Sequence, residues 1–312
     1  MAEISTNIQK AIALLIDNEV IGFPTETVYG LAGNALSESA VLKIFDVKQR
    51  PKFDPLILHT SSIQRIEDFV LEIPDVAYQL FERFSPGPIT ILLPKKSNIP
   101  DIVTSGLSQV AIRIPNHPLA LNLLQKLPFP LAAPSANPFG YISPTSAQHV
   151  DNQLGTKIKL ILDGGESGIG VESTIIGFEK KKPVIFRLGG LSIEEIEEVT
   201  GKLEVRESSS SPAAPGMLKS HYAPQKPFLL GDINELLNKN KGKKIGLLSF
   251  RDQYKFENSY ILSTSGNFLE ASKNLFKYLR ILDESNVDII LAELVPDQNL
   301  GKAINDRLRR AA

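Results

Sequence analysis

The sequence lacks cysteine and tryptophan entirely, and it has no long hydrophobic run. The absence of cysteine excludes disulfide bonds, thiolate metal sites and a cysteine nucleophile. The apolar run nearest the start, 11–16, is far shorter than a membrane-spanning helix and has no basic segment before it. We therefore expect no membrane segment and no signal peptide, and a soluble, cytoplasmic protein.

An excess of charge of either sign is also absent, because 34 lysines and arginines face 35 aspartates and glutamates, for a formal net charge of -1. This balance argues against a protein that coats nucleic acid or membranes, although it leaves room for a local basic patch. The histidines are scattered and include no HExxH pair, which disfavours a histidine-built zinc site. The GxxxxGK[ST], GxGxxG and GxSxG signatures of other nucleotide and hydrolase sites are missing as well.

The chain of 312 residues suggests about two domains. Hydrophobic spacing predicts a helix over 8–16 with Ser5 or Thr6 as its cap, and further helices over 39–47 and near 62–83, 117–126 and 192–200. Strand-like runs lie between them, at 20–23, 56–59, 89–93, 110–114, 131–133, 160–162, 173–178 and 184–188. The last two runs flank 180–182 and predict a hairpin, so we expect an α/β fold with a mixed sheet.

The character of the sequence changes after Leu203. A serine run at 208–211 and prolines at 212, 215, 224 and 227 predict an extended linker over 204–227. A second α/β pattern follows, with strands at 228–230, 245–250 and 287–291 and helices at 268–282 and 302–310. We therefore divide the chain into a domain over 1–203, the linker and a small domain over 228–312.

Polar residues follow the first predicted strand in the segment 23–31, FPTETVYGL. Loops at strand ends are where α/β folds place ligands. Thr25 or Thr27 would equally serve as the N-cap of a helix. The pattern alone therefore leaves a binding loop and a capped helix open.

Cations gather at the end of the second predicted helix, where Lys48, Arg50 and Lys52 surround a proline. They would complement the helix dipole, or they would clamp phosphates. Three cations are more than a helix end needs, and we expect Lys48 and Arg50 to face solvent. Arg113 and Arg187 lie on predicted strands, where each must pair with a carboxylate or meet an anionic ligand.

Two further loops combine small polar residues with glycine. The segment 133–145 contains PSAN and offers Ser135, Asn137 and Ser143, although alone it is typical of an ordinary turn-rich loop. The glycines of 164–175, GGESGIGVESTI, let backbone amides approach an anion, or form a flexible hairpin.

Taken together, these segments resemble the YrdC/Sua5 family, the L-threonylcarbamoyladenylate synthases. The motifs FPTETVYGL, KxRP, PSAN, GGxSxxGxESTI and HYAP occur in the family's order across nearly the whole chain. The resemblance implies a YrdC-like catalytic domain with a twisted mixed sheet and flanking helices. It also implies a small Rossmann-like α/β C-terminal domain of the Sua5 type.

The activity implied by the resemblance joins L-threonine, bicarbonate and ATP into threonylcarbamoyl-AMP and pyrophosphate, for the t6A37 modification of tRNA. A carbamate formed on threonine attacks the ATP α-phosphate, and Mg2+ accompanies the ATP. The implied partners are a downstream tRNA threonylcarbamoyl transferase complex and tRNA itself.

The resemblance also implies roles residue by residue. Lys48 and Arg50 would hold the phosphates as the catalytic cations, Arg113 would meet the threonine carboxylate, and Tyr222 would fold over the nucleotide. The threonine-binding residues would be Thr27, His59, Arg113, Ala133 and Ser173. The ATP-binding residues would be Lys48, Arg50, Asp54, Gln109, Ser135, Asn137, Ser143, Arg187 and Tyr222.

Two departures from the family pattern stand out. Asp54 replaces a common asparagine, and binding of magnesium, acceptance from the ribose and capping of a turn are all open to it. The linker is less basic than in many relatives.

Two other functions compete with this one. An RNA-binding module of the same fold would need a broad basic face with aromatic residues, which the composition disfavours. Carbamoyl transfer of the hydrogenase-maturation kind accompanies a zinc finger, for which the chain has no cysteine.

Overall fold

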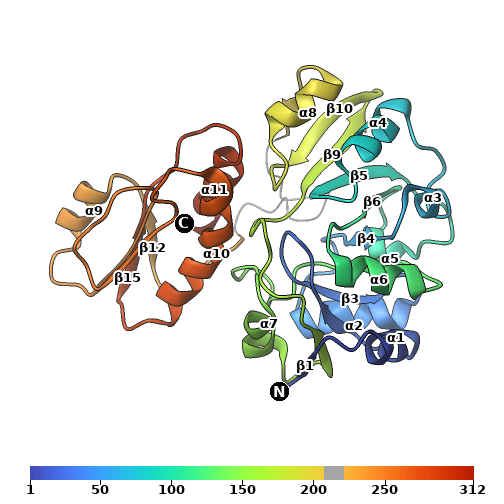
Figure 1. Ribbon diagram of the computed structural model, residues 1–312, viewed down its shortest axis with the longest axis horizontal. Helices are drawn as coiled ribbons and strands as arrows, with labels where there is room; N and C mark the ends of the chain where they lie inside the picture. The colour runs from blue at the N-terminus through green and yellow to red at the C-terminus, as the bar shows by residue number, and fades with distance from the viewer. Residues whose placement is uncertain (207–220) are drawn as a thin grey trace.

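The computed structural model describes residues 1–206 and 221–312, which form two α/β units side by side (Figure 1). The first unit is built on an 11-stranded sheet and the second on a 4-stranded sheet. The predicted linker, 204–227, lies mostly outside the described residues, and only its two ends are described. Within the two described ranges, no helix combines the length and the apolar character that crossing a membrane would require.

The first sheet has the strand order β1-β8-β2-β3-β7-β4-β6-β5-β9-β10-β11. Its strands are β1 (Glu3–Ser5), β2 (Ile21–Phe23), β3 (Gly30–Asn34), β4 (Ile57–His59), β5 (Ile89–Pro94), β6 (Gln109–Arg113), β7 (Leu131–Ala132), β8 (Leu160–Leu162), β9 (Thr174–Glu179), β10 (Lys182–Arg187) and β11 (Glu204–Val205). β4 and β6 pair parallel, whereas β9 and β10 pair antiparallel as a hairpin. The predicted mixed sheet and its late hairpin are confirmed. β11 still pairs with β10, so this sheet continues two residues past the expected boundary at 203.

The hydrophobic spacing predicts most helices of the first unit, but not the two over 101–104 and 147–154. They are α1 (Ile8–Ile16), α2 (Glu38–Lys48), α3 (Ile63–Ile66), α4 (Asp75–Phe84), α5 (Asp101–Thr104), α6 (Pro118–Lys126), α7 (Ala147–Leu154) and α8 (Ile193–Thr200). The N-cap of α1 is Asn7, whose side chain accepts from the backbone N–H of Lys10, and not Ser5 or Thr6. The predicted helix near 62–83 is divided into α3 and α4, with Pro74 as the N-cap of α4. Proline lacks the N–H that would continue a helix through this point.

The segment after β2 is a loop, and no helix begins there. The hydroxyl of Thr25 donates to the carbonyl of Val28 at 2.6 Å and accepts from the backbone N–H of Thr27 at 3.2 Å. This side chain therefore closes a turn between β2 and β3. The capped-helix alternative for FPTETVYGL is wrong, and the segment is a loop at a strand end.

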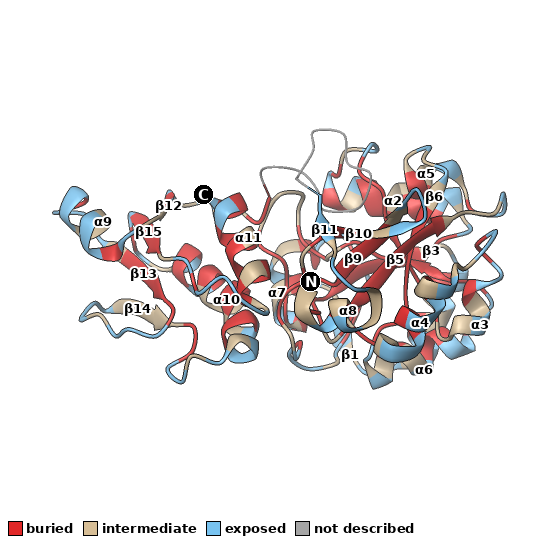
Figure 2. Cartoon of the chain, turned by 90° about the horizontal axis from the view of Figure 1, so that it is seen from above, coloured by how far each residue is buried: buried red, intermediate tan, exposed pale blue. Residues whose placement is uncertain are grey.

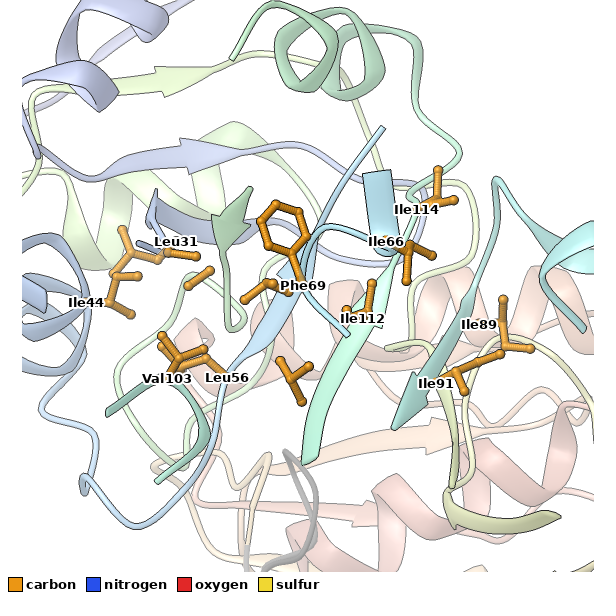
Figure 3. Close-up of a cluster of buried hydrophobic side chains, with 14 of the residues drawn as sticks. Leu31, Ile44, Leu56, Ile66, Phe69, Ile89, Ile91, Val103, Ile112 and Ile114 are labelled. Carbon is orange, nitrogen blue, oxygen red and sulfur yellow. The ribbon is translucent and has the colours of Figure 1, made fainter. Parts of the chain in front are cut away.

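Helices bury both faces of the first sheet. The largest core cluster, drawn in Figure 3, contains Leu31 and Ile112 from the strands and Ile44 from α2. Neighbouring strand residues alternate, so Ala32 points to a second cluster beneath α1 and α6. Figure 2 shows the buried strands enclosed by helices whose outer faces are exposed. Burial on both faces explains why the strands read as continuous apolar runs.

The second unit has a parallel sheet in the order β12-β15-β13-β14. Its strands are β12 (Phe228–Leu230), β13 (Ile245–Ser249), β14 (Asn258–Ile261) and β15 (Ile289–Ala292), and its helices are α9 (Ile233–Lys239), α10 (Phe268–Glu284) and α11 (Gly301–Ala311). α9 packs on one face, and α10 and α11 pack on the other. The expected small Rossmann-like α/β domain is confirmed, and its predicted buried strand lies inside the sheet as β15.

The two units share a hydrophobic core. α10 and α11 lie on the side of the second unit that faces the first (Figure 1). Val28, Ile142 and Val171 of the first unit belong to the same buried cluster as the inner faces of these helices. Arg280 of α10 is also buried and donates to the carbonyl of Ser143 at 3.3 Å. Packing and hydrogen bonding together therefore fix the position of the second unit.

Gly170 provides a test of this packing, because it meets α10 at very close range. Its φ is +84°, and a Cβ there would lie 2.4 Å from the carbonyl oxygen of Ser272. We expect Gly170→Ala to destabilise the protein by about 1–3 kcal/mol from backbone strain alone, with further loss from the clash. Gly168→Ala is the matched control, because its Cβ would meet nothing within 4 Å. Urea unfolding of both variants measures the difference, and equal stability would contradict the packing described.

Candidate active site

A cavity lies where strand ends and loops of the first sheet converge, with His221 and Tyr222 in its wall. The loop after β2, the segments around β4, β6 and β7, and the ends of β9 and β10 all contribute to it. Its lining residues are Thr25, Thr27, Val28, Gly30, Arg50, Pro55, Leu56, Ile57, His59, Arg113, Ala133, Pro134, Ser135, Glu172, Ser173, Arg187, His221 and Tyr222. Ligand sites of α/β proteins typically occupy such a position.

The structure brings together all of the residues expected to bind threonine. Thr27, His59, Arg113, Ala133 and Ser173 each line the cavity. His59 and Arg113 are direct neighbours, because β4 and β6 pair in the register that places one opposite the other. Nη1 of Arg113 donates to Oγ1 of Thr27 at 2.8 Å.

Arg113 has a carboxylate partner within the protein. Its Nη2 lies 2.7 Å from Oε1 of Glu26, and both side chains are almost fully buried. Its Nε donates to the carbonyl of Gly87 at 3.3 Å. The guanidinium is thus held in one orientation while it still forms part of the cavity wall.

His59 is an uncharged residue of the cavity. Its Nδ1 lies 3.2 Å from the carbonyl oxygen of Ile57, and its ring packs edge-on against Phe23. Burial, together with the charge of Arg113, lowers the pKa of His59 from 6.5 to about 3. His59 therefore offers a neutral imidazole to a ligand at neutral pH.

Ser173 and Arg187 form a second hydrogen-bonded group in the wall. Nη2 of Arg187 donates to the carbonyl oxygen of Ser173 at 2.8 Å and to its hydroxyl at 3.1 Å. The same hydroxyl lies 2.7 Å from Oγ1 of Thr90. Ser173 is therefore bonded to an arginine and a threonine, and no histidine is among these partners.

The expectation that Lys48 and Arg50 face solvent is wrong, because only 1% of Lys48 and 8% of Arg50 are exposed. Nζ of Lys48 donates to the carbonyls of Ser135 and Asn137, so it holds the PSAN loop from behind. Burial and the charge of Arg50 lower the pKa of Lys48 well below its usual value. These two carbonyls offset the cost of burying the polar end of Lys48, a burial that its position at a helix end does not predict.

Arg50 does line the cavity, and its partners are close in sequence. Its Nη2 lies 2.8 Å from Oδ2 of Asp54 and donates to the carbonyl of Pro55 at 2.9 Å. Asp54 is fully buried and is not a lining residue. Among the roles left open for Asp54, the structure supports the closing of this turn through its ion pair.

The remaining expected ATP residues lie at different distances from the cavity. Ser135, Arg187 and Tyr222 line it, whereas Asn137 and Ser143 are buried but do not line it. The amide of Asn137 donates to the carbonyl of Tyr141 at 2.8 Å and shapes the PSAN loop.

Gln109 is not brought to the cavity. It begins β6 and lines a separate hollow with Pro94 and Phe178. Arg113 ends the same strand, and four extended residues span about 13 Å. Gln109 and Arg113 therefore lie at different sites although they are close in sequence.

Among the titratable residues that line the cavity or pair with its arginines from the first unit and the HYAP segment, sequence reasoning did not assign Glu26, Glu172 and His221. Each lies inside a quoted motif, but only the folded chain shows which carboxylate meets which arginine. Glu172 is buried in the cavity wall and pairs with Arg307 of α11 at 2.8 Å. The sequence indicated that such carboxylate partners must exist, because a buried arginine needs one, but it did not indicate which residues they are.

The fold and the cavity define an α/β protein with a candidate site that is lined by Arg50, Arg113 and Arg187. A family model described as telomere recombination, of the Sua5, YciO and YrdC proteins, matches residues 13–189. A second model, described as the C-terminal domain of threonylcarbamoyl-AMP synthase, matches residues 191–312. The chain belongs to the Sua5/YrdC family, in the two-domain form.

Individual relatives agree over almost the full length. A threonylcarbamoyl-AMP synthase of Pyrococcus abyssi is 43% identical over 98% of this chain and 94% of its own length. One of Bacillus subtilis is 41% identical over 99% of this chain and 95% of its own length. The crystal structure of P. abyssi Sua5 complexed with L-threonine matches with a TM-score of 0.94 and 41% identity, covering 100% of this chain and 97% of that one.

The buried neutral state of His59 predicts a loss of stability in acid. The unfolded chain binds a proton at this residue near pH 6.5, whereas the folded chain does so only near its pKa of about 3. Well above pH 6.5, His59 is uncharged in both states and does not change the free energy of unfolding. As the pH drops from 6.5 toward 3, protonation of His59 in the unfolded chain lowers the free energy of unfolding. At pH 5 the loss amounts to about 2 kcal/mol.

We expect His59→Gln to remove this share of the pH dependence. Urea unfolding at pH 7.5 and pH 5 should show a smaller acid loss for the variant than for the parent chain, whatever the absolute stabilities are. An identical loss in both proteins would show that His59 is not held neutral in the folded state.

Proposed function

We propose that this chain is an L-threonylcarbamoyladenylate synthase, which converts L-threonine, bicarbonate and ATP into threonylcarbamoyl-AMP and pyrophosphate. The observation that carries the proposal is the cavity, in which Arg50, Arg113 and Arg187 line one buried space among small hydroxyl and alanine residues. Such a wall suits a carboxylate and phosphates together. Relatives named threonylcarbamoyl-AMP synthase, which match nearly the whole chain, support this catalytic function over an RNA-binding module.

The chemistry needs no nucleophile from the protein. The neutral amine of threonine attacks the carbon of bicarbonate, and water leaves to give a carbamate. An oxygen of the carbamate then attacks the α-phosphorus of ATP, while the bond to the β-phosphate oxygen breaks and pyrophosphate departs. Ser173 bonds to Thr90 and Arg187, and His59 lies against a carbonyl, so these two residues do not form the Ser–His pair of a covalent route.

The protein contributes position and charge. Thr27, His59, Arg113, Ala133 and Ser173 form the threonine subsite, in which Arg113 meets the carboxylate. Arg50, Ser135, Arg187 and Tyr222 form the wall of the ATP subsite. Holding both substrates in one geometry converts a bimolecular attack into an intramolecular one. The cations neutralise charge that develops on the departing pyrophosphate.

Lys48, Asn137, Ser143 and Asp54 support this subsite from behind. Lys48 and Asn137 shape the PSAN loop that presents Ser135. Asp54 holds the guanidinium of Arg50 in place. Their function in the reaction is therefore to orient the residues that face ATP.

Magnesium would enter with ATP and be held mainly by its phosphates. Among the described residues, no group of three or more histidine or acidic side chains is close enough to bind a metal ion. The nearby carboxylates of Glu26, Asp54 and Glu172 are each paired with an arginine. When bound, the ion would neutralise phosphate charge, and the arginines would supply the rest.

The product is a mixed anhydride that water hydrolyses, so a second enzyme must take it up. In this proposal a tRNA threonylcarbamoyl transferase complex receives it for the t6A37 modification, with tRNA as a further contact, in the cytoplasm. The family resemblance supports these partners.

Incubation of the protein with ATP, L-threonine, bicarbonate and magnesium tests the function. We expect pyrophosphate release that depends on threonine and bicarbonate, together with the mass of threonylcarbamoyl-AMP. Release without threonine would contradict the proposal, and so would the absence of the adenylate from a protein that binds both ATP and threonine.

Arg113→Lys tests the threonine subsite. A lysine retains the charge but replaces the planar guanidinium fork with a single ammonium group, which loses the bidentate geometry for a ligand carboxylate. We expect the KM for threonine to rise roughly tenfold or more, with the KM for ATP nearly unchanged. Arg83→Lys, on the exposed side of α4, is the matched control. A rise in the KM for ATP alone would assign Arg113 to the nucleotide instead.

A further inference from the structure

Helix α11 of the second unit delivers an arginine to the rear of the cavity. Arg307 is 0% exposed although it lies near the end of the chain. Its Nε donates to Oε2 of Glu172 at 2.8 Å, and its Nη2 donates to the carbonyl of Leu188 at 2.9 Å. Its Nη1 donates to Asp306. Each nitrogen of this guanidinium therefore has a hydrogen-bond partner, and two of the partners, Glu172 and Leu188, belong to the first unit.

Glu172, the main partner, is a carboxylate in the wall of a cavity that would hold a triphosphate. Burial acts to raise the pKa of Glu172, but Arg307, Arg187 and the hydroxyl of Ser143 together lower it to about 2. The carboxylate is thus ionised at neutral pH. Without a cation behind it, its charge would repel the phosphates across a medium of low dielectric constant.

The same guanidinium also packs on Tyr222. The carbon Cζ of Arg307 lies 4.9 Å from the centre of the tyrosine ring, and that of Arg310 lies 4.8 Å from it. Phe276 of α10 stacks on the ring with a centroid distance of 5.5 Å. Tyr222 has a φ of +71°, a backbone conformation that surrounding contacts must hold in place for a tyrosine. The second unit therefore sets the position of this residue of the cavity wall.

We propose that Arg307 is a positioning residue for ATP, which cancels the charge of Glu172 and holds Tyr222 against the cavity. This inference rests on the proposed function, because it requires ATP to occupy the cavity. It gives the second unit a direct part in nucleotide binding, through one side chain that reaches both Glu172 and Tyr222.

A purely structural role for Arg307, as one more contact between the units, makes a different prediction. Lys302 of the same helix also crosses between the units, where it pairs with Glu194 of α8 at 2.7 Å. Neither Lys302 nor Glu194 lines the cavity. Lys302→Met therefore removes a contact between the units without changing the charge beside the nucleotide, and it serves as the matched control.

The experiment compares Arg307→Gln with Lys302→Met in steady-state kinetics. We expect Arg307→Gln to raise the KM for ATP roughly tenfold or more, because Glu172 is left unpaired, and to change the KM for threonine less than about twofold. Lys302→Met should leave both constants unchanged. An equal rise in both constants for Arg307→Gln, or the same change in both variants, would overturn the proposal.

A second substitution separates charge from folding. Adding Glu172→Gln to Arg307→Gln removes the unpaired carboxylate, so the KM for ATP should return at least partly toward that of the parent chain. If Arg307→Gln does not fold, Arg307→Lys takes its place, because it keeps the charge but loses the planar fork, and its KM for ATP should rise above that of the parent chain while its KM for threonine stays nearly unchanged. A double variant with no recovery would overturn the proposal.

The outcome for the parent chain distinguishes this inference from the proposed function. A parent chain that forms threonylcarbamoyl-AMP, with an Arg307→Gln variant that shows no ATP-selective defect, overturns the inference alone. A parent chain that forms no adenylate overturns both.

Discussion

Burial of arginine beside a carboxylate is the constraint on which the rest of this structure depends. Arg113 pairs with Glu26 at 2.7 Å, and Arg50 pairs with Asp54 and Arg307 with Glu172 at 2.8 Å each. Removing such charges from water is costly unless the geometry is good and the remaining donors are satisfied. Backbone carbonyls accept further hydrogen bonds from each of these arginines. The result is a set of cations that are fixed before any ligand arrives, which is the condition for electrostatic preorganisation.

The three pairs act over increasing separations along the chain. Arg50 and Asp54 are four residues apart and close a turn, so they define the wall locally. Arg113 and Glu26 come from β6 and from the loop after β2, so they require the first sheet to be assembled. Arg307 and Glu172 are 135 residues apart and join the two units. The cavity is therefore complete only when the second unit is docked.

Docking of the second unit depends on apolar packing as well as on charge. Val28 lies in the loop that carries Thr27, and Val171 precedes Glu172 and Ser173. Both valines are buried in the cluster formed by α10 and α11. The segments that supply ligand-facing residues are thus part of the core that holds the units together. Disturbing this core would move the wall of the site as well as lower stability.

Much of the fold and most of the site were determined by the sequence itself, because periodicity and breakers act locally. The hydrophobic period of α1 predicts its bounds, the turn residues of FPTETVYGL lie at a strand end as predicted, and the order of the motifs identifies the family.

The partner of each buried side chain was decided only by the tertiary structure. Lys48 lies at a helix end that the sequence predicts to be exposed, yet the PSAN loop packs against it and accepts its hydrogen bonds through two carbonyls. Gln109 is four residues from Arg113, yet an extended strand carries the two apart. Arg307 lies in the helix that the sequence predicts over 302–310, and only contact between segments far apart in the chain buries it against Glu172. Such contacts depend on how distant strands and helices pack together, which local spacing does not specify.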